Sequence, residues 1–154
     1  MIYSERMTAA IDEEFVVFLI GMRVNKPWKI HKWFPVAKSM PKMLTELYQN
    51  PELGLLGHEQ WFGRTTIMIQ YWKSFQHLED YAKNKTTAHL PAWANFNKSV
   101  GQSGDVGIWH ETYISGKGRH ECVYNNMPKF GLAKVGKHVD AQGKYKSAKD
   151  RMNA

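Results

Sequence analysis

Histidines are the residues of this sequence best suited to chemistry, and the chain of 154 residues has seven of them. Imidazole has an unperturbed pKa close to neutral pH, so it can act as a general base, a proton shuttle or a metal ligand. No two of the seven form an H-x-x-x-H or H-x-x-E-H pair on a predicted helix, which argues against a zinc site. We therefore examine the histidines as single pocket residues.

His110 and Glu111 are neighbours in a predicted strand over residues 104–115. Successive side chains of a strand point to opposite faces, so these two cannot form an acid–base dyad, and only one of them can face a given pocket. His110 is either a pocket base, proton shuttle or axial ligand, or a core histidine that has a hydrogen-bond partner. We take His110 and Glu111 as catalytic candidates on opposite faces.

Two further histidines lie where a pocket could use them. His58 shares a strand face with Gln60, which suits either a polar pocket wall or an edge strand facing solvent. His89 precedes Pro91 at the start of a predicted helix, where it could lie near the helix N-terminus or close a pocket from the loop. We expect His89 to be catalytic and His58 to contact substrate.

Aromatic residues form 13% of the chain, which is more rings than a core of this size requires. Aromatic walls suit a flat or apolar ligand, although core or dimer packing could also use them. Nucleophile-elbow, Walker and dinucleotide-binding motifs are absent, so hydrolytic and nucleotide-dependent chemistry have no support. The further residues predicted to bind substrate are Tyr71, Trp93, Asn97, Trp109, Tyr113, Tyr124 and Asn126.

The net charge of +7 is concentrated near one end, where residues 129–154 include seven basic and two acidic side chains. This distribution is typical of a solvated tail, so we expect neither nucleic acid nor a membrane as partner. The longest apolar run, residues 15–22, is too short to cross a bilayer and follows three acidic residues. The single cysteine, Cys122, excludes an intramolecular disulfide and favours the cytoplasm.

Hydrophobic patterning predicts the elements that position these residues. Residues 15–23 are apolar on both faces, as in a central strand, and residues 55–74 form a hairpin that turns at Gly63 and Arg64. Helices are predicted over 37–50, with Pro41 in its first turn, over 75–84, with Ser74 as N-cap, and from Pro91 to Val100.

The resulting order, β-α-β-β-α-β, predicts an α+β, ferredoxin-like domain whose antiparallel sheet has helices on one face. Apolar side chains on both strand faces imply a homodimer in which a second copy covers the other face, unless the C-terminal segment does so. We expect an N-terminal extension (1–14), the ferredoxin-like domain (15–136) and a basic tail (137–154).

The segments SFQHLEDY (74–81) and HLPAWANF (89–96) resemble the second-helix region of the antibiotic-biosynthesis-monooxygenase superfamily. Ser74, Leu78 and His89 match its pattern of a serine that opens the helix, a leucine one turn later and a histidine beyond. Residues 107–113 and 124–132 are similar to a small monooxygenase-like branch with relatives in fungal terpenoid pathways such as fumagillin biosynthesis. The resemblance covers residues 15–136.

The resemblance implies a dimeric α/β barrel with a pocket between sheet and helices. We expect a small enzyme that oxidises an aromatic or polycyclic molecule without a cofactor, with His110 or His89 as base. One alternative is a haem protein with dehydratase or oxygenase chemistry, for which His110, His89 and His58 are candidate axial ligands. The other is a non-catalytic dimer that binds an apolar ligand.

Overall fold

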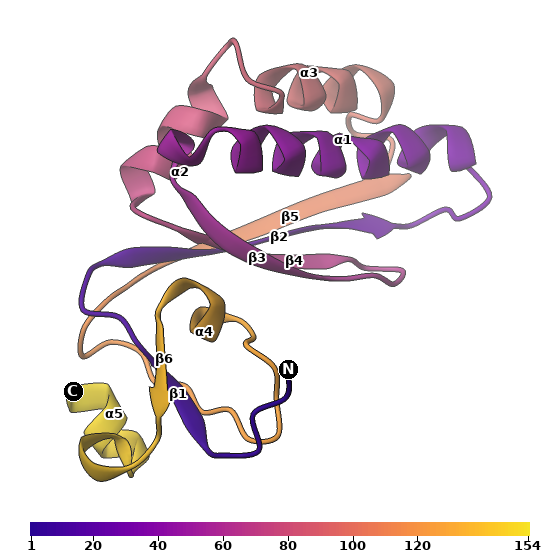
Figure 1. Ribbon diagram of the computed structural model, residues 1–154. Coiled ribbons are helices and arrows are strands. Elements are labelled where there is room, and N and C mark those ends of the chain that lie inside the picture. The colour runs from indigo at the N-terminus through magenta and orange to yellow at the C-terminus, as the bar shows by residue number, and fades with distance from the viewer.

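The computed structural model describes all 154 residues and consists of a sheet covered by helices on one face and a smaller unit on its other side (Figure 1). The main sheet has four strands in the order β3-β4-β2-β5, and every neighbouring pair is antiparallel. This is the ferredoxin-like arrangement expected from the sequence. The strands are β2 (Phe15–Val24), β3 (Leu55–Trp61), β4 (Ile67–Trp72) and β5 (Val106–Ser115).

The central strand β2 pairs with β5 along its whole length, from Phe15 opposite Ser115 to Val24 opposite Val106. Its even-numbered residues face the helices, and its odd-numbered residues face the smaller unit. Both faces are apolar, as expected for a strand covered on each side. The core under the helices contains six buried side chains from five elements: Val16, Leu47, Leu55, Trp72, Leu78 and Tyr81.

Helix α1 (Ile30–Gln49) is longer than the sequence predicts. Residues 30–35, which were expected to belong to a connection, are helical, and Pro41 lies in the interior of the helix, not in its first turn. Each of the two internal prolines lacks the amide hydrogen that would bond to the preceding turn. Hydroxyl groups donate to the carbonyls of both prolines, Ser39 to Pro35 at 3.1 Å and Thr45 to Pro41 at 2.9 Å.

Helices α2 (Phe75–Lys83) and α3 (His89–Ser99) form the rest of the layer. Ser74 caps α2 by accepting a hydrogen bond from the amide of His77, as predicted. Gly101, at φ +46°, ends the turn that follows α3, a conformation that favours glycine. A short 3-10 turn (Pro51–Leu53) joins α1 to β3.

The residues predicted as an N-terminal extension and a basic tail form an ordered unit together. Strand β1 (Met7–Ala10) pairs antiparallel with β6 (Lys137–Asp140), and helix α5 (Ala148–Asn153) packs beside them. Arg151 is 8% exposed and its Nε donates to Glu121 at 2.6 Å. The residues expected to form a solvated tail are therefore part of folded elements, although their lysines remain exposed to solvent. A 3-10 turn (Gly143–Tyr145) precedes α5.

Part of the second sheet face is covered by the segment that leads into this unit. Helix α4 (Leu132–Val135) places Val135 against Gly57. Glu59 accepts a hydrogen bond from the amide of Gly131 at 2.9 Å and forms an ion pair with Lys134 at 2.7 Å. The cover reaches β3 and β4, while Tyr113 on β5 remains 53% exposed. None of the helices is long and apolar enough to cross a membrane.

Candidate functional site

A cavity of about 930 Å³ lies between the sheet and the three long helices. Its volume is within the range of small-molecule sites. Helix α1 contributes one stripe of residues at helical spacing, and the sheet contributes the helix-facing side chains of β2, β4 and β5. The main wall residues are Phe18, Ile20, Met22, Val36, Met40, Met43, Met68, Leu78, Trp93, Phe96 and Ile108.

The lining is mostly apolar, with four methionines among the wall residues named above. Methionine is flexible and polarisable, so such walls adapt to the shape of a ligand. Few titratable groups reach the cavity: His89 from α3, His110 from β5, Glu79 from α2 and Lys98 from α3. The chemistry of this site therefore depends on a small number of side chains.

His89 is held in one orientation by the backbone. Its Nδ1 lies 2.9 Å from the carbonyl oxygen of Ala82, which can only accept, so Nδ1 is the protonated nitrogen. In the neutral ring Nε2 then has a free lone pair, and no protein group bonds to it. An imidazole fixed in this way is prepared to take a proton or to bind a metal through Nε2.

A second interaction fixes the start of α3. The carboxylate of Glu46, on α1, accepts hydrogen bonds from the hydroxyl of Tyr81 at 2.8 Å and from the amide of Ala88 at 3.0 Å. Burial, followed by the hydrogen bond to Glu46, raises the pKa of Tyr81. Ala88, the residue before His89, is thus bonded to α1 and linked through Glu46 to α2. The ring centroid of Tyr81 lies 6.1 Å from that of His89.

His110 lies on the sheet side of the same cavity. It stands opposite Ile20 in the register of β2 and β5, and its ring centroid is 5.6 Å from that of Phe18. It is exposed and has no hydrogen-bond partner, so it is not the satisfied core histidine that the sequence left open. The structure brings two of the three candidate histidines, and Trp93, to one cavity.

His58 is not part of the cavity lining. Its Nδ1 lies 2.7 Å from the hydroxyl of Tyr48 on α1, beyond the cavity end where the helix packs on the sheet. Burial lowers the pKa of His58. Asn97 also lies outside, exposed on α3, and Asn126 is an exposed turn residue with φ +54°.

The remaining predicted residues lie on the other side of the sheet. Glu111 accepts a hydrogen bond from the hydroxyl of Tyr113 at 2.7 Å, and both are exposed. Trp109 packs over Gly21 of the neighbouring strand β2, where a Cβ would lie 2.6 Å from the indole Nε1, so glycine is needed for this close approach. None of the three can share a cavity with His110.

Tyr71 and Tyr124 lie close together between the sheet and the smaller unit. Their hydroxyls both approach Gly131, and burial raises the pKa of Tyr71 to about 12. Burial also raises the pKa of Tyr124. These tyrosines belong to the contact between the sheet and the smaller unit, which explains part of the surplus of aromatic rings.

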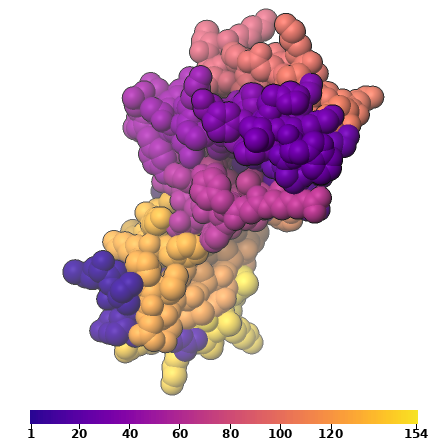
Figure 2. Space-filling view, turned by 90° about the vertical axis from the view of Figure 1, so that its right-hand side faces the viewer, coloured from indigo at the N-terminus to yellow at the C-terminus, as the bar shows by residue number.

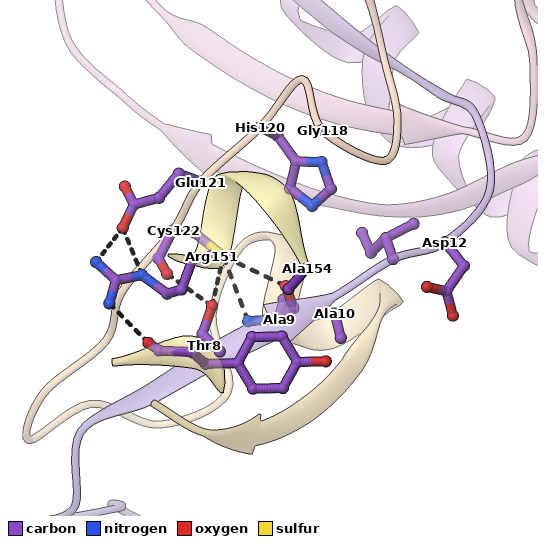
Figure 3. Close-up of a pocket in the computed structure, with 12 residues that line it drawn as sticks. Thr8, Ala9, Ala10, Asp12, Gly118, His120, Glu121, Cys122, Arg151 and Ala154 are labelled. Carbon is purple, nitrogen blue, oxygen red and sulfur yellow. Dashed lines mark hydrogen bonds and ion pairs between the residues drawn. The ribbon is translucent and has the colours of Figure 1, made fainter. Parts of the chain in front are cut away.

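A second hollow, around Cys122, is too small for a ligand (Figure 3). Its volume of about 10 Å³ is that of a single water molecule at most. The thiol of Cys122 accepts a hydrogen bond from the amide of Ala9 at 3.3 Å. This bond ties the loop between β5 and α4 to β1. No three histidine, cysteine or acidic side chains converge as a metal site.

Comparison with known proteins identifies the family. The family model described as "Monooxygenase af470-like" matches residues 15–132, which is most of the chain. The chain belongs to this af470-like monooxygenase family. The resemblance to a small monooxygenase-like branch is thereby confirmed.

One curated protein and one solved structure are similar to this family member over most of its length. It is 28% identical over 122 residues to "Monooxygenase af470" of Aspergillus fumigatus, an alignment that covers 72% of this chain and 42% of the relative. The chain thus spans about two fifths of the length of that curated relative. A crystal structure of aldoxime dehydratase is similar at a TM-score of 0.67 and 16% identity, covering 86% of this chain and 41% of the other.

A third similar structure is SnoaB of Streptomyces nogalater, described as a cofactor-independent oxygenase. Its TM-score is 0.46 at 12% identity, with 65% of this chain and 91% of the other covered. At 16% identity the aldoxime dehydratase structure supports the fold of this family member and leaves its reaction open.

Proposed function

We propose that this protein oxidises an apolar, aromatic small molecule inside the cavity between sheet and helices, with His89 as the base. The observation behind the proposal is the fixed tautomer of His89, whose Nδ1 bonds to Ala82 and whose Nε2 is free at an apolar cavity of about 930 Å³. Membership of a monooxygenase-like family agrees with this reaction class.

The proposed reaction begins when Nε2 of His89 removes a proton from an acidified C–H of a bound substrate. The carbanion then reduces dioxygen, so the electrons come from the substrate and no cofactor is required. One oxygen atom enters the substrate as a carbonyl that replaces CH₂, and the other leaves as water. The apolar walls exclude water and hold the anion beside oxygen.

His110 is proposed as the second polar contact of the substrate. It comes from the sheet, whereas His89 comes from the helical layer, so a flat molecule between them can meet one imidazole at each side. Because it has no protein partner, its ring is free to donate to a developing oxyanion. Trp93 and Phe96, stacked at 5.6 Å, supply an aromatic wall on α3.

Haem is the second candidate, and the residues present fit it. An axial histidine usually donates its other N–H to a carbonyl, as His89 does to Ala82 at 2.9 Å. Lys98 lines the same cavity and could meet a propionate. Bound haem would supply an iron for oxygen activation or for Lewis-acid dehydration. His89 would hold it, and the methionine and aromatic walls would exclude water from it.

A homodimer is part of the proposal. The smaller unit leaves Glu111, Tyr113 and the edge strand β5 exposed, and Ile114 is 50% exposed on the other strand face. An exposed edge strand with apolar side chains favours pairing with a second copy. Sedimentation of the purified protein tests this, and a monomer at micromolar concentration would contradict it.

The function is tested by oxygen uptake with a panel of polycyclic phenols that carry an acidified CH₂ group, after an absorption spectrum with and without added hemin. His89→Ala should reduce turnover about 100-fold or more. The matched control is His58→Ala, which removes a histidine outside the cavity and should leave turnover unchanged. A saturable Soret band that His89→Ala abolishes would assign haem instead. Binding of the phenols with no oxygen uptake would reduce the protein to a ligand-binding module.

A further inference from the structure

One end of the molecule displays apolar side chains to solvent. It is formed by the end of β2, the loop into α1 and the turn between β3 and β4. Trp28 is 74% exposed, Ile30 58% and Phe62 82%. Figure 2 views this end directly: the indigo start of α1 lies between the salmon α3 region above and the magenta β3–β4 segment below.

Cations surround these side chains. The segments that form this end, residues 20–34, 61–66 and 96–107, include six lysines and arginines, and Asp105 is their only acidic residue. Asp105 forms ion pairs with Lys26 at 2.7 Å and with Lys29 at 2.9 Å. The other four cations, Arg23, Lys32, Arg64 and Lys98, face no carboxylate.

Hydrogen bonds hold the segments of this end together. Arg23 donates to the hydroxyl of Thr65 at 2.6 Å, and Lys32 donates to the carbonyl of Ser99 at 2.6 Å. The amide of Val24 donates to the carbonyl of Arg64 at 2.8 Å. The exposed apolar side chains therefore project from a fixed frame, not from a free tail.

We propose that this end binds the surface of an anionic lipid bilayer. Tryptophan and phenylalanine favour the interfacial region of a bilayer, and lysine and arginine are attracted to anionic headgroups. A surface that combines both binds more strongly than either alone. A nucleic acid would use the cations and could stack on Trp28, but the aliphatic Ile30 would gain nothing from it.

The position of the cavity supports a lipid surface. Phe62 and Lys98 belong to the exposed end and also line the cavity. An apolar molecule dissolved in the bilayer could enter the cavity at this end without crossing water. Four of the six cations lie within residues 23–32, but Arg64 and Lys98 join them only in the fold, so the charge count by segment gave no reason to expect a membrane partner.

Co-sedimentation with phosphatidylcholine vesicles, with and without phosphatidylserine, tests the proposal. The protein should bind the anionic vesicles and be released by salt. Trp28→Ser with Phe62→Ser, and separately Lys32→Glu with Lys98→Glu, should each lower the partition coefficient at least about tenfold. Circular dichroism checks that both variants remain folded.

Matched controls come from the opposite end of the molecule. Ile2→Ser with Val123→Ser removes exposed apolar side chains of the smaller unit, and Lys146→Glu with Lys149→Glu reverses charges there. Both should bind as the wild type does. Equal binding by all variants, loss of binding in the controls instead, or no binding to either vesicle would overturn the proposal. So would binding of a DNA duplex, in place of vesicles, through Trp28 and Lys32.

Discussion

The hydroxyl of Tyr81 donates a hydrogen bond to the carboxylate of Glu46 at 2.8 Å, and this contact joins α2 to α1 beside the start of α3. Tyr81 is 4% exposed, so the bond is shielded from water. Tyr81→Phe should lower the free energy of unfolding by about 1.5–3 kcal/mol, the range for a hydrogen bond to a charged group. Chemical denaturation measures the change.

The matched control for this bond is Tyr48→Phe. Tyr48 is 53% exposed and its hydroxyl bonds to His58 at the surface, so its loss should cost well under about 1 kcal/mol. If both variants unfold at the same denaturant concentration, the Tyr81–Glu46 contact does not stabilise the helical layer.

The cavity gives a prediction that does not depend on the reaction. Met40→Trp would place a larger ring in the cavity from α1 and should reduce binding of a fluorescent apolar probe such as anilinonaphthalene sulfonate. The stability cost should stay within about 1–3 kcal/mol, because the cavity has room for the ring. Lys42→Trp, two residues along the same helix and exposed, should bind the probe normally. Unchanged binding by Met40→Trp would place the probe elsewhere.

A buried polar pair under the helices predicts a non-additive result. The indole of Trp72 donates to the side-chain oxygen of Gln70 at 2.9 Å, and both residues are buried. Trp72→Phe leaves that oxygen without a partner and should cost about 2–4 kcal/mol. Adding Gln70→Leu removes the unpaired group. The loss in free energy of unfolding of the double variant should therefore be smaller than the sum of the two single losses by about 1 kcal/mol or more. Additive costs would show that the pair is not coupled.

Asp105 predicts how stability depends on pH. Hydrogen bonds from Lys26 and Lys29 lower its pKa below the ordinary 3.8. Because the folded protein binds this proton less readily than the unfolded chain, the stabilisation is present above pH 3.8 and is lost as pH falls further. Asp105→Asn should therefore be less stable than wild type at neutral pH, and the gap should narrow below about pH 4.

Denaturation of both proteins across this pH range measures the gap. Asp12→Asn serves as the control, since Asp12 is exposed and lies 3.8 Å from Lys137. Its stability should follow the wild type throughout. A constant difference between Asp105→Asn and wild type from neutral to acid pH would contradict the assigned role of the carboxylate.

The sequence predicted the main sheet well because its signals are local. Phe15 to Arg23 is apolar on both faces, Gly63 and Arg64 mark the hairpin turn, and Ser74 caps α2. The start of α1 was missed because Pro35 argues against a helix when propensity is considered alone. In the structure the helix nevertheless continues through Pro35, and Ser39 adds a hydroxyl hydrogen bond to the proline's own carbonyl.

The site was predictable in part. His89, His110 and Trp93 line one cavity, whereas Tyr71 and Tyr124 lie beneath the smaller unit. Alternation along a strand shows which residues share a face, but it does not show which face the helices cover. The α1 wall had a signal, since Val36, Met40 and Met43 are at helical spacing, but such a stripe more often packs against a core.

The pairing of β1 with β6 sets the order in which this protein can complete its fold. Met7 pairs with Tyr124 and lies opposite Asp140, so β1 has its full set of partners only when residues 124–140 have been synthesised. The four-stranded sheet needs nothing beyond residue 115 and can form earlier during translation. Contacts between residues so distant in sequence form slowly because closing the intervening chain costs entropy. We expect an intermediate in which the cavity between sheet and helices is already built while Tyr71 is still uncovered.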